Sequence, residues 1–408
     1  MVEVIADLQV HSKHARATSK DLSILNLEKW GKIKGLNLIG TGDFQHPEHR
    51  KEIDKFLKED DKGILWTKNK EIAFLWQTEI SLMYSENEKR RAVHLLIFSP
   101  NRETTDKITE YLGSKGRLDY DGRPIFGLSC KEITRDLKNI NDMIEIIPAH
   151  CMTPWFGIFG SRSGFDSLKE AFGEYYDKIY AIESGMSADP SMLWRFSEIA
   201  KEKNVVSFSD AHSFWPWRLG REATIFDIEE LSYENIINAI RTGDGIKATI
   251  ETPPEYGRYH WDGHRLCNFS CSPTKTKELN GICPKCEGKM TIGVEYRVEE
   301  IAEKEKGFRP IHGKDFYRLL PLHELIVLYT GKGISSKGNW TIYNSLIEKF
   351  ENELDILIKV SKEKLIEGDV DGKFVDLILK NRKDKIKINP GYDGVYGEAI
   401  LEKQKTLF

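Results

Sequence analysis

The sequence predicts an α/β protein: a distorted seven-stranded (β/α) barrel, then a small cysteine-rich module and a mostly helical C-terminal part. Through residue 245, short runs of β-branched and apolar residues alternate with amphipathic stretches, which is typical of βα units around a parallel sheet. Polar side chains stand at the ends of these runs. Four cysteines then fall within twenty residues and separate the barrel from the C-terminal helical part.

The first strand is predicted in VEVIADLQV, and a helix follows from Asp21 to Lys34, where Gly35 ends it. The second strand is LNLIGTGDF. Five further strands are predicted in EIAFLWQTEI, AVHLLIF, MIEIIPAH, KIYAIESG and VVSFSDAH. Helical stretches lie between them, near residues 102–112, 130–140, 165–175 and 190–203.

A segment rich in proline, glycine and aromatic residues, ETPPEYGRYHWDG, marks a domain boundary near residue 252. We therefore expect three units: a barrel at 1–252, a zinc module at 253–298 and a helical domain at 299–408. Helical spacing of apolar residues in VEEIAEKEKG, LHELIVLYTGKG and IYNSLIEKFENELDILIKV supports the last of these.

The composition is that of an ordinary globular protein, 40% hydrophobic and 30% charged. There is no apolar run long enough to span a membrane and no secretory leader, so we expect a cytoplasmic protein without a membrane partner. With 60 Lys and Arg against 64 Asp and Glu, the overall charge does not by itself indicate nucleic-acid binding.

Acidic residues and histidines stand at or near the ends of the predicted strands: Asp7, His11, Asp43, His46, Glu79, His94, His150, Glu183, Asp210 and His212. The carboxyl ends of parallel barrel strands open onto one face, so we expect these side chains to converge. Any one histidine in a strand is more often a hydrogen-bonded core residue than a ligand. The whole set is hard to explain by packing alone.

Burying so many polar groups costs several kcal/mol unless they are paired, and divalent metals supply that pairing. Imidazole nitrogen mixed with carboxylate oxygen suits zinc, manganese or iron better than calcium or magnesium alone. Two or more such ions lower the pKa of a water and clamp a phosphodiester. The sequence therefore predicts a multi-metal phosphoesterase site.

The motifs ADLQVHS, GTGDFQHP, QTEIS, AVHLL, PAHCMTP and SDAHS resemble those of the polymerase and histidinol phosphatase (PHP) superfamily. The fold that this resemblance implies is a PHP barrel. Within that superfamily the chain resembles the endonuclease Q family. The segments that carry this likeness are GTGDFQHP, IESGMSADP, SDAHSFWPWRLGREA, MTIGVEYRVEEIAE and NPGYDGVYGEA, and they span nearly the whole chain.

The resemblance implies an endonuclease that cuts damaged DNA on the 5′ side of uracil, hypoxanthine or an abasic site. It implies two or three divalent metals, from among zinc, manganese, magnesium and iron. One metal would be bound by His11, Glu79 and Asp210. Glu79 would bridge to a second metal, held by His94 and His150. The turn after the second strand, with Asp43 and His46, would hold a third together with His212. The expected catalytic residues are Glu79, His150, Asp210 and His212, and Asp7 is a further expected ligand.

Gln9 departs from the superfamily pattern, because a histidine usually stands at this position. A glutamine oxygen is a weaker ligand than imidazole, so we expect Gln9 to hold its metal loosely, or through a water. His14 is either a further ligand or an exposed residue. The other ligands remain, which favours an active enzyme.

Four basic residues near the ligand motifs are candidates for contacts with DNA phosphates, or else form a solvated face: Lys13, Arg16, Arg218 and Arg221. Aromatic residues in the loops after His150 and His212 either stack on an extruded base or pack in the core: Trp155, Phe156, Phe159, Phe214, Trp215 and Trp217. The late loop NPGYDGVYG adds Tyr392, Asp393 and Tyr396 as candidates for a lesion pocket.

The spacing of Cys267, Cys271, Cys283 and Cys286 fits a structural zinc site with four thiolates. His264 lies close enough to give an alternative ligand set. Cys130 and Cys151 are expected to be packing residues.

Two other functions stay open. One is a PHP phosphoesterase for a small phosphorylated metabolite, against which the extra zinc module and helical domain argue. The other is a noncatalytic DNA-binding PHP subunit, which only Gln9 supports. The C-terminal QKTLF loosely resembles a tail that binds a replication clamp.

Overall fold

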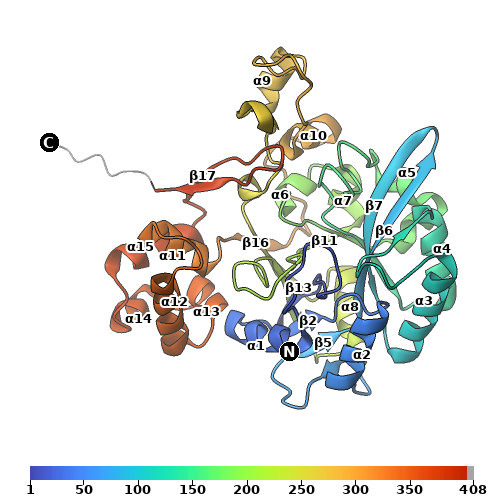
Figure 1. Ribbon diagram of the computed structural model, residues 1–408, viewed down its shortest axis with the longest axis horizontal. Helices are drawn as coiled ribbons and strands as arrows, with labels where there is room; N and C mark the ends of the chain where they lie inside the picture. Colours follow the sequence, from blue (N-terminus) through green and yellow to red (C-terminus); the bar gives the residue numbers. More distant parts are fainter. Residues whose placement is uncertain (402–408) are drawn as a thin grey trace.

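The computed structural model describes residues 1–401. Figure 1 shows the strands of the N-terminal part at the centre of the larger lobe, with helices around them. The C-terminal helices form a second group beside this lobe, and the cysteine-rich module projects next to α10. Within residues 1–401, no helix is long and apolar enough to cross a membrane.

The largest sheet has eight strands and mixed direction. In sheet order they are β16 (Asp315–Arg318), β13 (Ile246–Glu251), β12 (Ala223–Ile228), β1 (Val2–Asp7), β2 (Leu38–Gly40), β5 (Ala73–Leu75), β4 (Leu65–Trp66) and β3 (Lys58–Glu59). β1, β2 and β5 run parallel, whereas β12 pairs antiparallel with both β1 and β13.

Two smaller sheets belong to the same N-terminal part, which keeps the name barrel from its predicted fold. One consists of β8 (Ile125–Phe126), β6 (Gln77–Glu86), β7 (Lys89–Phe98) and β9 (Glu145–Pro148), and the other of β10 (Ala181–Glu183) and β11 (Asn204–Val206). β7 runs antiparallel to both β6 and β9, so the prediction of seven parallel strands is wrong. The predicted strand EIAFLWQTEI is likewise two strands, β5 and β6, in different sheets.

A tight turn explains the antiparallel pair. β6 and β7 are joined by Asn87 and Glu88, both with positive φ angles, of 51° and 63°. Two such residues in succession are typical of the turn that closes a β-hairpin, but glycine usually occupies the second position. Because Glu88 stands there instead, the sequence carries little sign of the hairpin.

The helices around the barrel are α1 (Ile24–Lys34), α2 (Pro47–Phe56), α3 (Arg102–Lys115), α4 (Cys130–Ile140), α5 (Leu168–Phe172), α6 (Pro190–Leu193), α7 (Ser197–Glu202) and α8 (Tyr233–Thr242). The side chain of Ser23 caps α1, and Gly35 ends it with a φ of 97°. Glycine adopts this left-handed conformation without strain, which is why the predicted end of the helix is correct.

The rest of the chain holds α9 (Pro273–Glu278), α10 (Val294–Ile301), α11 (Leu322–Thr330), α12 (Lys337–Phe350), α13 (Glu353–Ile358), α14 (Lys362–Glu367) and α15 (Gly372–Arg382). Two short hairpins accompany them, β14 (Asp262–His264) with β15 (Phe269–Cys271), and β17 (Lys387–Asn389) with β18 (Glu398–Ile400). The long helical pattern predicted near 342–360 is interrupted at Glu351, whose φ is 71°.

The helical part is packed tightly onto the barrel. β16 extends the barrel sheet next to β13, and one cluster of buried apolar residues continues from the barrel into α11–α15. The C-terminal part therefore shares its core with the barrel. The limits of the three domains remain a prediction.

Candidate active site

Glu79 is the carboxylate around which the histidines gather. It is the third residue of β6 and is fully buried. Its Oε1 atom lies 2.6 Å from His94 Nδ1 and 3.4 Å from His150 Nε2, and these two nitrogens are 3.1 Å apart. Its Oε2 atom lies 3.1 Å from His11 Nε2. One carboxylate therefore joins two groups of candidate ligands.

The second group consists of His11, Asp210 and His212. His11 Nε2 lies 3.1 Å from Asp210 Oδ1, and His212 Nδ1 lies 3.6 Å from the same oxygen. In each group, the three candidate ligand atoms all lie within 4.8 Å of one another. The structure thus brings together side chains about 200 positions apart in the sequence.

Two of these residues have unusual backbone conformations. His150 follows β9 with a φ of 30°, and Asp210 has a φ of 49°. A residue with a Cβ adopts such angles at a cost of about 1–3 kcal/mol, and such strain clusters at functional sites. The backbone N–H of His150 donates to buried Glu183, and an isolated bridge pairs Val10 with Ala211. These contacts hold both ligands in place.

The donor set fits divalent metals. Two imidazole nitrogens 3.1 Å apart face the same carboxylate oxygen, an arrangement that hydrogen bonding alone satisfies poorly. Gln9 Nε2 donates to Glu79 Oε2 at 2.9 Å, while Gln9 Oε1 is buried and has no hydrogen-bond partner within residues 1–401. Mixed nitrogen and oxygen ligands of this kind suit zinc, manganese or iron.

Besides Gln9, three predicted ligands are not members of either group, namely Asp7, His46 and Asp43, and their binding of metal stays a prediction. The Asp7 carboxylate accepts hydrogen bonds from the backbone N–H groups of Ser209 and Gly220, at 2.9 and 2.8 Å, so its oxygens are occupied. His46 is the residue just before α2, and its ring stacks on that of His14 with 4.4 Å between the ring centroids. Within residues 1–401, the second-strand turn and His212 do not assemble a third metal group.

Asp43 is the third of these residues, and it orients a ligand. Its Oδ1 atom lies 3.1 Å from His11 Nδ1, and its Oδ2 atom accepts from the backbone N–H of Ser12 at 2.7 Å. A carboxylate behind an imidazole holds the ring so that the opposite nitrogen faces a metal. His11 Nε2 accordingly points toward Glu79 and Asp210.

The carboxylates and histidines influence each other's protonation. Burial disfavours charge on Glu79, but the nearby His94 and Arg123 outweigh it and lower the pKa of Glu79 well below its usual range. Burial lowers the pKa of His94 to about 3. Burial also opposes charge on Asp43, yet neighbouring His11 brings the pKa of Asp43 down to about 2. The groups thus favour ionised carboxylates and, at His94, a neutral imidazole free to bind metal.

A cavity of about 470 Å³ opens over the two groups. Of the predicted DNA-binding residues, four line it: Trp155, Arg218, Arg221 and Tyr396. The cavity is also lined by Arg123, Arg258 and Tyr259, which were not predicted from the sequence. They lie in loops that carry no strand-end motif, so their types alone do not distinguish them from other surface residues.

The other predicted DNA-binding residues lie elsewhere. Lys13 pairs with Glu52 at 2.7 Å, and Arg16 with Asp121 at 3.1 Å. Phe156 stacks on the His94 ring at 4.3 Å, and Tyr392 donates a hydrogen bond to Asn268 at 2.6 Å. The remaining aromatic candidates and the two lone cysteines pack inside the protein, fully or in part: Phe159, Phe214, Trp215, Trp217, Cys130 and Cys151.

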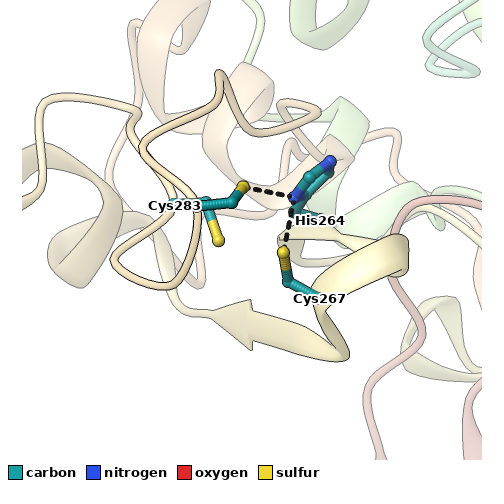
Figure 2. A group of neighbouring side chains, drawn as sticks. His264, Cys267 and Cys283 are labelled. Carbon is teal, nitrogen blue, oxygen red and sulfur yellow. Dashed lines mark hydrogen bonds between the residues drawn. The ribbon is translucent and has the colours of Figure 1, made fainter.

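The cysteine-rich module brings together His264, Cys267, Cys283 and Cys286. Figure 2 labels the first three of these. His264 Nδ1 lies 3.2 Å from the sulfur of Cys267 and 3.2 Å from that of Cys286. The buried thiol of Cys271 instead lies 3.3 Å from the hydroxyl of Thr276 and stands outside this group. Among the described residues, the ligand atoms that lie within 4.8 Å of one another thus belong to three cysteines and one histidine, a set that also suits zinc, and the four-cysteine set stays a prediction.

A barrel that carries histidine–carboxylate groups around a shared glutamate, under a cavity lined with arginine, defines the class of a metal-dependent phosphoesterase. The whole chain is similar to a crystal structure of the lesion-specific endonuclease PfuEndoQ from Pyrococcus furiosus. The TM-score is 0.87 at 30% identity, and the match covers 100% of this chain and 98% of that one. This chain belongs to the endonuclease Q family.

A second crystal structure, of endonuclease Q with a 27-mer duplex substrate that has an abasic lesion at the active site, gives a TM-score of 0.88. The identity is 31%, with 99% of this chain and 98% of that chain covered. Residues 321–385 match the family described as the MJ0043 C-terminal domain. The uncharacterized protein MJ0043 of Methanocaldococcus jannaschii is 34% identical over 265 residues, 63% of this chain. The chain spans about a third of that relative, 32% of its length.

Proposed function

We propose that this protein is a DNA repair endonuclease that hydrolyses the phosphodiester bond on the 5′ side of a deaminated base or an abasic site. The observation that carries the proposal is the cavity in which both ligand groups meet Arg218, Arg221 and aromatic side chains. The full-length likeness to an endonuclease Q bound to a lesion-bearing duplex supports it.

Divalent metals bound by the two groups would polarise a phosphoryl oxygen and lower the pKa of a water. In the hydrolysis, the water oxygen bonds to phosphorus, one phosphorus–oxygen ester bond breaks, and the leaving oxygen takes up a proton. Glu79 and Asp210 contribute negative charge at the site, while Asp43 keeps the His11 ring oriented through its Nδ1 atom.

The residues that line the cavity can hold the DNA while its backbone is cut. Arg221 donates two hydrogen bonds to the Ser209 carbonyl, at 3.2 and 3.0 Å, and its buried Nη1 atom has no partner among the residues that the structure describes. Such a fixed guanidinium is suited to a backbone phosphate. Trp155 packs edge-on against Tyr259 at 5.4 Å, and together they offer aromatic surface for an extruded base.

The test is a denaturing-gel assay on end-labelled DNA that carries one deoxyuridine, one deoxyinosine, an abasic site or no lesion, with manganese, magnesium or zinc. We expect a metal-dependent nick just 5′ of the lesion. The nick should disappear in His150→Ala and persist in the matched control His312→Ala, because His312 is exposed. Intact DNA with a metal-loaded protein would refute the proposal and leave small phosphoesters as the substrates to test.

Two predictions stay outside this experiment. The suggested clamp-binding tail, QKTLF at 404–408, lies outside the described residues. The zinc in the cysteine-rich module is proposed to be structural, because that module has little apolar core of its own.

A further inference from the structure

Arg123 is the cavity arginine that lies against the shared carboxylate. Its Nη1 atom is 3.5 Å from Glu79 Oε1, and its side chain is only 23% exposed. It also lines the cavity beside His94, His150 and Asp210. Arg218 and Arg258 instead lie over the Tyr396 ring, at 5.8 and 4.5 Å.

The loop that carries Arg123 is anchored on both sides of it. The backbone N–H of Gly122 donates to the His14 carbonyl at 3.1 Å, and the Gly122 carbonyl accepts from Gln45 Nε2 at 2.6 Å. The Pro124 carbonyl accepts from the backbone N–H of Ser81, in β6, at 2.9 Å. These contacts fix the loop to the strand that carries Glu79.

The residue before Arg123, Gly122, has no room for a side chain. A Cβ atom at Gly122 would collide with the carboxylate of Asp43, the residue that orients His11. The Arg123 backbone N–H donates to Asp121 Oδ1 at 3.1 Å. The backbone at Arg123 is therefore held close to both ligand groups, and its side chain reaches Glu79 from there.

The contact with Glu79 occupies only a small part of the hydrogen-bonding capacity of the Arg123 guanidinium. Glu79 already contacts His94 and Gln9 at shorter distances, 2.6 and 2.9 Å. Among the described residues, the contact with Glu79 is the one hydrogen bond from the Arg123 side chain, and it is long. A guanidinium has five N–H donors in a planar fork that matches the oxygens of a phosphate.

We propose that Arg123 is a catalytic residue that binds a nonbridging oxygen of the phosphate undergoing cleavage. There it stabilises the negative charge that develops as the ester bond breaks. This role rests on the proposed phosphodiester hydrolysis, and it differs from that of Arg218 and Arg221, which are placed to hold the DNA backbone.

The experiment compares Arg123→Ala and Arg123→Lys with wild type and with Arg117→Ala. Arg117 is a matched control from the same loop, because it is exposed and its ion pair among the described residues is with Asp119. Single-turnover nicking of abasic DNA, bound metal and the calorimetric affinity for inorganic phosphate are measured for each metal-loaded protein.

We expect Arg123→Ala to slow nicking about 10²–10³-fold, as loss of one transition-state donor does. We also expect it to bind phosphate about tenfold more weakly with its metal content unchanged. Arg123→Lys should be intermediate, because it keeps the charge but not the fork. Added guanidinium ion should partly restore Arg123→Ala, and Arg117→Ala should match wild type.

Two outcomes overturn the assignment. One is that Arg123→Ala nicks DNA as fast as wild type and binds phosphate with the same affinity. The other is a lower rate that excess metal restores fully, which would show that Arg123 acts only on the metal groups. If wild type cuts no DNA, the proposed function fails, while the phosphate titration still decides whether Arg123 binds phosphate.

Discussion

A buried ion pair joins the barrel to the helical domain, and its removal should reveal how strongly the two parts depend on each other. Lys34 Nζ, at the end of α1, lies 2.6 Å from Glu353 Oε1, at the start of α13. Their side chains are 1% and 0% exposed. Lys34 also donates to the carbonyl of Pro216 at 2.8 Å, in the loop that follows His212.

The magnitude follows from the contacts that each change would leave unpaired. Glu353 also accepts from the backbone N–H of Leu322 at 3.0 Å and from the Tyr343 hydroxyl at 2.9 Å. Lys34→Met therefore leaves a buried carboxylate without its cation, and Glu353→Gln leaves a buried ammonium with the Pro216 carbonyl. Each change should lower the free energy of unfolding by about 3–5 kcal/mol.

The double variant separates charge pairing from packing. Lys34→Met with Glu353→Gln removes both charges, so we expect its loss to resemble that of one single variant and not the sum of two. The assay is urea unfolding of the full chain, followed by circular dichroism. Lys359→Met is the control: its ion pairs with Glu3 and Asp355 are half-exposed and should contribute at most about 1 kcal/mol.

Either of two results would refute this reasoning. One is a loss below about 1 kcal/mol in both single variants, which would mean that the pair contributes no more than an exposed one. The other is additivity in the double variant, which would mean that the two charges do not depend on each other.

Two further predictions concern groups away from the cavity. Burial raises the pKa of Glu222 to about 8 from a usual value of 4.5, so the folded state keeps a proton that the unfolded state releases between these pH values. The free energy of unfolding should thus fall as pH rises through this window, by up to about 1.4 kcal/mol per pH unit. Glu222→Gln should reduce this fall in urea titrations at pH 5, 6.5 and 8. If the slope of unfolding free energy against pH is the same in the variant, the pKa shift is contradicted. In the cysteine-rich module, Cys271→Ser should keep the thiolate-to-cobalt absorption of the cobalt-substituted protein, whereas His264→Ala or Cys283→Ser should weaken it. Loss of the band in Cys271→Ser would restore the four-cysteine set.

The ligand types were readable from the sequence because they recur at strand ends. Glu79, His94, His150, Asp210 and His212 each lie in or just after a run that forms a strand or leads into the site, and their mixture of nitrogen and oxygen donors indicates metal. The α/β class and several helix limits were predictable for a similar reason. Apolar periodicity and capping residues such as Ser23 and Gly35 act locally, within a few positions.

The tertiary structure decided which of the candidates come together in a group that could hold a metal. Asp7 and Asp43 have the same side chain as Asp210 and similar positions after strands, but hydrogen bonds from Ser209, Gly220 and Ser12 occupy their oxygens. Sequence spacing does not reveal such contacts, because Ser209 and Gly220 lie more than 200 positions from Asp7 along the chain.

The same limit applies to the grouping of His264 with three of the cysteines and to the position of Arg123. Both depend on where loops return after a long path, and residue type does not encode that path. The sequence by itself determined the kinds of ligands and their order along the chain. The packing of distant segments determined which atoms meet, because a metal group needs its ligand atoms within a few ångströms of one another, a far finer condition than any sequence pattern imposes.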